Sequence, residues 1–179
     1  STATLDAALA VAHHMIQTTN EPHRAEALLG EVAVLAGRTP YGRAQLANSR
    51  GLLAWKLGRL DEAAIAYREA ARYALRVRDD GIELNALMMY SELLAELGYL
   101  SAAAHWARHV RDLLEASGAD PGHIASASRT LGWIGLQLRA AGRDELDPEG
   151  PYRDALALLG PGGRAENLDK VGGARLGLA

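Results

Sequence analysis

The chain contains no cysteine, so disulfide bonds, thiolate metal sites and cysteine nucleophiles are excluded. It has no apolar run near the roughly 18 residues of a membrane-spanning helix, and no signal peptide is visible. Charge of one sign is not in large excess either. The net charge of −3 over 179 residues argues against a main role in binding nucleic acid or anionic membranes. We therefore expect a cytoplasmic protein that binds neither nucleic acid nor a membrane.

Motifs of catalysis and cofactor binding are also missing. Residues 160–163 (Gly-Pro-Gly-Gly) lack the G-K-[ST] ending of a phosphate loop, and no G-x-S-x-G elbow occurs. The acidic residues of segment 144–149 do not follow the EF-hand pattern. His105 and His109 have a spacing that can bind zinc, but a third ligand is not evident. We expect a non-enzymatic protein without a cofactor or a metal.

The chain does have a helical repeat of apolar residues. Hydrophobic residues make up 49% of it, and no β-branched run alternates with a period of two. Apolar side chains recur three and four positions apart, as in Leu5, Leu9, Ala12 and Ile16. Glycine and proline interrupt this pattern at short intervals. The sequence predicts an all-α fold of about eight helices, in which short loops join antiparallel neighbours.

An internal repeat becomes visible when the chain is aligned on Gly58, Gly98 and Gly142, which follow one another at intervals of 40 and 44 residues. Such a period is typical of stacked helical hairpins. We place the repeat domain at residues 1–159. Its units span about 4–37, 43–80, 83–120 and 123–159. The following segment, 160–179, has six glycines between Gly160 and Gly177, and we expect it to form a C-terminal tail.

The helix ends in this repeat follow from local signals. Gly58 and Gly98 are suited to end a helix, because the residue after a helix often adopts a left-handed conformation. Asp61 and Ser101 follow them closely and are good N-cap residues for the next helix.

Small residues recur where two helices would cross. Gly51 and Gly135 lie seven residues before a helix-ending glycine, and Ser91 takes the same place in the middle unit. A mid-helix glycine costs roughly 1 kcal/mol relative to alanine, so a packing gain should offset it. We expect the second helix to approach closely at these positions, with Ala63 as its small residue and Tyr67 filling the space beside it.

This pattern resembles the tetratricopeptide repeat family, whose motif is W-x2-L-G-x2-Y followed by A-x3-F and P. Gly51, Ala63 and Tyr67 match it, and Leu87 and Leu131 begin conservative versions in the next two units. The resemblance covers roughly residues 4–159. The 40-residue spacing exceeds the usual ~34 and is similar to that of long-repeat bacterial signalling proteins. It implies an α-α superhelix, a right-handed solenoid of antiparallel hairpins.

The resemblance further implies a scaffold in a larger signalling or regulatory protein, whose concave face binds an extended protein or peptide segment. The family's groove positions fall on Gln45, Asn48, Leu52, Trp55, Asn85, Met88, Glu92, Arg129, Leu136 and Arg139. The family's clamp for acidic chaperone tails needs a Lys and Asn pair, and Asn48 and Leu52 stand at those places. We therefore do not expect that ligand.

Two alternatives stay open at this point. The exposed end of the stack could pair with another copy of the chain, since repeat arrays need polar caps at their ends. The groove could also serve as a small-molecule pocket, with or without catalysis.

A further basic feature is the helix face of Arg68, Arg72 and Arg76. It could meet an acidic partner or a phosphate. We expect a solvated face instead, because exposed charge is the default and three nearby acidic residues can neutralise part of it: Glu69, Asp79 and Asp80.

Overall fold

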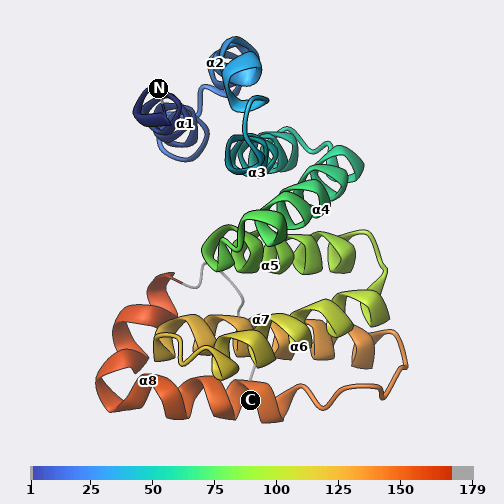
Figure 1. Ribbon diagram of the computed structural model, residues 1–179. Coiled ribbons are helices and arrows are strands. Elements are labelled where there is room, and N and C mark those ends of the chain that lie inside the picture. Colours follow the sequence, from blue (N-terminus) through green and yellow to red (C-terminus); the bar gives the residue numbers. More distant parts are fainter. Residues whose placement is uncertain (1, 171–179) are drawn as a thin grey trace. The chain divides into compact units, whose positions relative to one another are not determined.

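The computed structural model describes residues 2–170, and the side chains of residues 3–159 (Figure 1). These residues form eight α-helices and no β-strand, which confirms the all-α prediction. The helices are α1 (Thr2–Gln17), α2 (Pro22–Ala36), α3 (Pro40–Lys56), α4 (Leu60–Val77), α5 (Asp80–Glu96), α6 (Leu100–Ala116), α7 (Pro121–Ala140) and α8 (Glu149–Lys170).

The chain divides into two compact units, unit 1 (residues 1–106) and unit 2 (residues 107–179), and the division falls within α6. In unit 1 each helix from α1 to α4 packs against the next one along the chain (Figure 1). Helix α3 also packs against α1 and α5, so the odd-numbered helices are neighbours of one another. In unit 2, α7 packs against α8. Short loops between consecutive helices make these pairs antiparallel hairpins.

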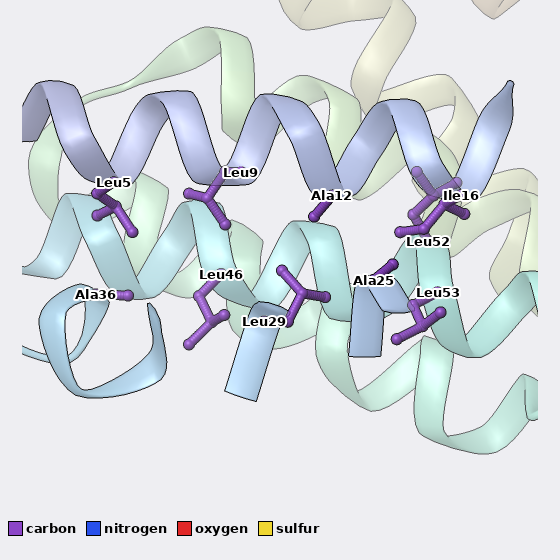
Figure 2. Close-up of a cluster of buried hydrophobic side chains, with 10 residues drawn as sticks. All are labelled: Leu5, Leu9, Ala12, Ile16, Ala25, Leu29, Ala36, Leu46, Leu52 and Leu53. Carbon is purple, nitrogen blue, oxygen red and sulfur yellow. The ribbon is translucent and has the colours of Figure 1, made fainter. Parts of the chain in front are cut away.

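The core of unit 1 begins where α1 meets α2 and α3 (Figure 2). The apolar stripe of α1 faces the leucines of α3, as the helical spacing predicts. The buried residues of this cluster are Leu5, Leu9, Ala12, Ile16, Ala25, Leu29, Ala36, Leu46, Leu52 and Leu53. Each fully buried leucine contributes roughly 1.5–3 kcal/mol relative to an exposed one.

The helix-ending glycines adopt the predicted left-handed conformation. Gly58 has φ +72°, and its N–H donates to the carbonyl of Trp55 (2.9 Å). The N–H of Arg59 donates to the carbonyl of Ala54 (2.8 Å), which completes a Schellman motif. Gly98 and Gly142 have φ +85° and +72° and end α5 and α7 in the same way. Glycine therefore recurs at this place in the repeat because the residue that follows each helix has a positive φ.

The N-cap predictions for Asp61 and Ser101 are wrong. Helix α4 begins at Leu60 and α6 at Leu100, so both polar residues lie inside the first helical turn. In α4 the Schellman motif turns the chain so tightly that Arg59 already occupies the cap position, without a capping side-chain bond. The carboxylate of Asp61 still lies near the positive end of the helix dipole, which is favourable.

The close crossing of α3 and α4 at Gly51 is confirmed. A Cβ atom at Gly51 would lie 2.9 Å from Cδ1 and Cε1 of Tyr67, whose side chain is only 1% exposed. Ala63 is fully buried on the same helix as Tyr67. The tyrosine ring thus rests directly on the backbone of α3, as the small residue at position 51 predicted.

The corresponding crossing in unit 2 uses a different glycine. A Cβ atom at Gly132 would lie 2.8 Å from the ring of Tyr152, whereas Gly135 faces Cα of Pro148 at 2.9 Å. The expectation that Gly135 meets the second helix of its pair is therefore wrong. The loop between α7 and α8, residues 141–148, is longer than the corresponding loops 57–59 and 97–99 and contains an insertion. This inserted segment lies against Gly135 through Pro148, and the helix crossing is displaced by one turn.

The predicted C-terminal tail, residues 160–179, begins with helical residues. Helix α8 continues through this glycine-rich segment to Lys170. Glycine raises the entropic cost of a helix but does not forbid helical dihedral angles, which is why composition alone is a weak guide here. Residues 171–179 lie outside the described residues.

The Gly51–Tyr67 contact can be tested by replacing Gly51 with alanine, using Gly30→Ala as the matched control. Gly51→Ala should lower the free energy of unfolding by about 1–3 kcal/mol, because the buried ring has little freedom to move. Gly30 lies within α2 with nothing within 4 Å of an added Cβ, so Gly30→Ala should raise it by roughly 0.5–1 kcal/mol. Urea unfolding measures both, and equal effects of the same sign would contradict the close crossing.

Candidate functional site

Helices α1 and α3 border an open hollow of about 270 Å³. Its lining is mostly polar and comes from both helices: Asp6, Leu9, Ala10, His13, Tyr41, Gln45, Asn48 and Ser49. The contributing positions follow one helical face on α1 (6, 10, 13) and one on α3 (41, 45, 48). The two predicted residues Gln45 and Asn48 are therefore brought together at a concave feature of unit 1.

Side-chain amides extend this surface from α3 to α5. Nδ2 of Asn85 donates to Oδ1 of Asn48 at 3.1 Å, and Nε2 of Gln45 donates to the hydroxyl of Tyr41 at 3.0 Å. Asn85 is exposed, and Gln45 and Asn48 are half-buried. An amide can make up to four hydrogen bonds. These contacts therefore hold the amides in place and leave them capacity for a ligand.

Trp55 lies farther along the same face of α3 and contacts α5. Its Nε1–H donates to Oε2 of Glu96 at 3.2 Å, and its ring is half-buried. The indole N–H is thus occupied by the protein, while part of the ring is open to an apolar group.

These contacts define one surface, which we call the odd-helix face because α1, α3 and α5 form it. On α5 the positions 85, 88, 92 and 96 share one side of the helix. The side chains of the odd-helix face are Asp6, His13, Tyr41, Gln45, Asn48, Trp55, Asn85, Met88, Glu92 and Glu96. It joins six of the predicted groove residues to others that sequence reasoning missed.

Leu52 does not contribute an exposed side chain to this face. It is 9% exposed and belongs to the core cluster that α1 and α2 close (Figure 2). Its place on α3 follows the groove pattern, but α1 packs over it. Leu52 therefore stabilises the support of the odd-helix face and has little surface for a ligand.

Glu92 lies close enough to the buried Tyr67 to affect its ionisation. Burial raises the pKa of Tyr67 well above its ordinary value of about 10, and the negative charge of Glu92 raises it further. Glu92 is half-buried, so one carboxylate is near both the odd-helix face and the core beneath it.

The three predicted groove residues of α7 lie in unit 2. Arg129 is half-buried beside Tyr152; burial raises the pKa of this phenol, and the Arg129 cation lowers it in part. Leu136 is 36% exposed. Arg139 contacts the carboxylates of Asp147 (3.7 Å) and Glu149 (3.8 Å) at the start of α8. The guanidinium of Arg139 thus already has acidic neighbours within its own unit.

Sequence reasoning missed Asp6, His13, Tyr41 and Glu96. The sequence does contain a pattern that could have indicated them. Each residue lies on the same helical face as other residues of the surface, at spacings of three, four or seven positions. On α1 the signal was hidden, since the first repeat unit departs furthest from the family pattern. Glu96 was hidden because it becomes part of the face only through the register between α3 and α5.

The charged side chains of the odd-helix face are mainly acidic. Asp6, Glu92 and Glu96 contribute carboxylates, while none of its named side chains is a lysine or an arginine. In unit 1 this face therefore favours a cationic or hydrogen-bonding ligand over an anionic one.

Other candidate sites have structural explanations. Among the described residues, no three histidine, aspartate or glutamate side chains are placed to hold a metal ion. The ring of His105 packs edge-on against Trp106, with centroids 5.5 Å apart. In the acidic segment, Asp147 accepts hydrogen bonds from the N–H groups of Glu149 and Gly150 (3.1 Å each) and so caps α8.

In the described part of the chain, no helix is both long enough and apolar enough to span a membrane. No protein-family model matches the chain, and the search of curated proteins found no match either.

Tyr67 should make stability depend on alkaline pH. Its folded-state pKa lies above the unfolded value of about 10, so its stabilising contribution is complete below that pH and is lost as the pH rises through the folded value. The free energy of unfolding should therefore fall as the pH rises above about 10, by up to about 1.4 kcal/mol per pH unit for this group.

The variant Tyr67→Phe should flatten this fall, because phenylalanine keeps the ring and has no proton to lose. Tyr99→Phe is the matched control, since Tyr99 is 62% exposed. Urea unfolding across the pH range measures both. An unchanged slope in Tyr67→Phe would refute the assignment.

Proposed function

We propose that this chain is a non-enzymatic binding module of the tetratricopeptide type, and that the odd-helix face of unit 1 holds an extended segment of a partner protein. The observation that carries the proposal is the row of amides Gln45, Asn48 and Asn85 beside the hollow of about 270 Å³. Such a row supplies both donors and acceptors over two neighbouring helices.

The chemistry of the row suits a peptide backbone. An extended segment presents alternating N–H and C=O groups, each of which must be satisfied when water is removed. The amides of Asn48 and Asn85 can serve either group, and their mutual hydrogen bond fixes their orientation before the ligand arrives. Preorganisation of this kind lowers the entropic cost of binding.

The charge of the odd-helix face indicates which kind of partner segment should bind better. Because Asp6, Glu92 and Glu96 are carboxylates, a segment that carries lysine or arginine should bind better than an acidic one. The half-buried ring of Trp55 offers a place for an apolar side chain or for the stem of such a cation.

The type of larger protein that would contain this module is inferred from the resemblance of the sequence to tetratricopeptide repeats. The long repeat spacing favours a scaffold within a larger bacterial signalling or regulatory protein in the cytoplasm. Arg129, Leu136 and Arg139 stay predicted groove residues of unit 2. The absence of a motif that places nucleophile, base and acid together supports a non-enzymatic role.

The proposal can be tested by selecting peptides from a random display library with the whole chain and measuring their affinities in solution. The double variant Gln45→Ala/Asn85→Ala should weaken the selected peptides about tenfold or more, because two hydrogen-bonding groups are lost. Selected sequences should be enriched in lysine and arginine.

The matched control is Glu31→Ala/Arg68→Ala, which removes two exposed side chains from even-numbered helices without a change of net charge. It should bind as the wild type does. Equal weakening in both variants, or selected peptides that bind equally to all three proteins, would place the site elsewhere. A rise in mass with concentration in the absence of peptide would favour self-assembly instead.

A further inference from the structure

Three arginines of unit 1 surround a single tyrosine ring. The guanidinium carbons of Arg43, Arg72 and Arg76 lie 5.9, 5.3 and 5.7 Å from the centroid of Tyr73. Arg43 comes from α3, and the other three residues come from α4. All three cations therefore converge on one small area at the edge of the α3–α4 hairpin, which we call the arginine cluster.

The base of the arginine cluster is rigid. Tyr73 is half-buried and packs against a core cluster of Ala44, Ala74 and Ile82 from three successive helices. Nε of Arg43 donates to the carbonyl of Gly37 at 2.9 Å, which holds this side chain near the loop between α2 and α3. The loop thus holds Arg43 beside the ring, and all three arginines stay exposed to solvent.

The cluster is not neutralised by the protein. In the part of the chain that the structure describes, no carboxylate forms an ion pair with Arg43, Arg72 or Arg76. The sequence led us to expect nearby acids to do so. Oδ1 of Asp79 instead accepts from the N–H of Ile82 (3.0 Å) and caps α5. Three like charges held together without a counterion repel one another, and a bound anion would relieve this repulsion.

The cluster is also separate from the odd-helix face. Arg43 lies two residues from both Tyr41 and Gln45. At about 100° per residue, its side chain leaves α3 on the side opposite to those two. A ligand of the cluster therefore need not be the ligand of the amide row.

We propose that the arginine cluster binds an acidic segment of a partner protein. Arg72 and Arg76 are one helical turn apart, a rise of about 6 Å along the helix axis. Alternate side chains of an extended peptide on one face are separated by about 6.7 Å. Carboxylates at alternate positions of an extended segment can thus meet these two arginines in turn, and Arg43 adds a third contact. Guanidinium groups bind carboxylates with strong, charge-assisted hydrogen bonds.

Nucleic acid fits this surface less well. The chain as a whole has a net charge of −3, and the acidic side chains of Glu69 and Asp80 lie close to the cluster in sequence. A long polyanion would meet these charges, whereas a short acidic segment need only cover the cluster.

The test uses the full chain and a fluorescent peptide with glutamate at alternate positions, measured by polarisation at low salt. The wild type should bind it, and the same peptide with glutamine in place of glutamate should not bind. The double variant Arg72→Gln/Arg76→Gln should weaken binding about tenfold or more, since two charge-assisted contacts are lost. Circular dichroism confirms that the helical content of each variant is unchanged.

The matched control is Arg50→Gln/Arg153→Gln, which removes the same charge from exposed positions elsewhere. Its affinity should stay within about twofold of the wild type, because unspecific attraction depends on net charge alone. Equal loss in both variants would overturn the proposal. So would a single-stranded oligonucleotide that binds more tightly than the peptide and is lost in Arg72→Gln/Arg76→Gln.

A third variant separates this proposal from the proposed function. Gln45→Ala/Asn85→Ala should leave the glutamate peptide bound, because these residues lie on the odd-helix face. Loss of the acidic peptide in that variant would assign it to the odd-helix face and refute the arginine cluster as its site. Loss of only the library-selected peptides would support two independent sites.

Discussion

The contact of the Tyr67 ring with the backbone of α3 at Gly51 sets the spacing of the helices in unit 1. Without a side chain at Gly51, α4 approaches α3 until the ring fills the gap between them. The same ring lies close enough to α5 for Glu92 to affect its pKa. One buried side chain thus packs on the first helix of the hairpin and lies near the first helix of the next. The distance from Asn48 to Asn85 and from Trp55 to Glu96 depends on this spacing.

Helix α3 separates two surfaces of opposite charge. Its odd-helix side is bordered by the carboxylates of Asp6, Glu92 and Glu96, and its other side presents Arg43 beside the arginines of α4. The small net charge of the chain does not reveal this separation, because the negative charges of one surface and the positive charges of the other cancel in the total. Charges on opposite sides of a helix about 10 Å wide are also largely screened from each other at physiological salt. Each surface can therefore act on its own ligand.

The sequence predicted those features that depend on local rules. The helices and the left-handed glycines follow from periodicity and φ preference, each of which acts within a few residues. The crossing at Gly51 was predicted because a small residue recurs at that place in the repeat. Other features that depend on how helices meet could not be predicted in this way. Leu52 matches the groove pattern, but α1 covers it. The Gly132–Tyr152 crossing escaped notice because the insertion before α8 shifts the register that the repeat implies. The arginine cluster needs Arg43 from a helix that sequence reasoning did not connect to Arg72.

The insertion also explains why unit 2 differs chemically from unit 1. In unit 1 Gln45 of α3 donates to Tyr41 and Asn48 accepts from Asn85 of α5, and these amides keep further hydrogen-bonding capacity. In unit 2 the inserted segment brings Asp147 and Glu149 to Arg139, and it lays Pro148 against Gly135. Exposed ion pairs of this kind stabilise a fold by only about 0–1 kcal/mol. A ligand carboxylate at Arg139 would nevertheless have to compete with two carboxylates already there. Among the described residues, the hydrogen-bond partners of the amide row are neutral, namely Tyr41 and the amides themselves. The proposed peptide binding is therefore expected in unit 1.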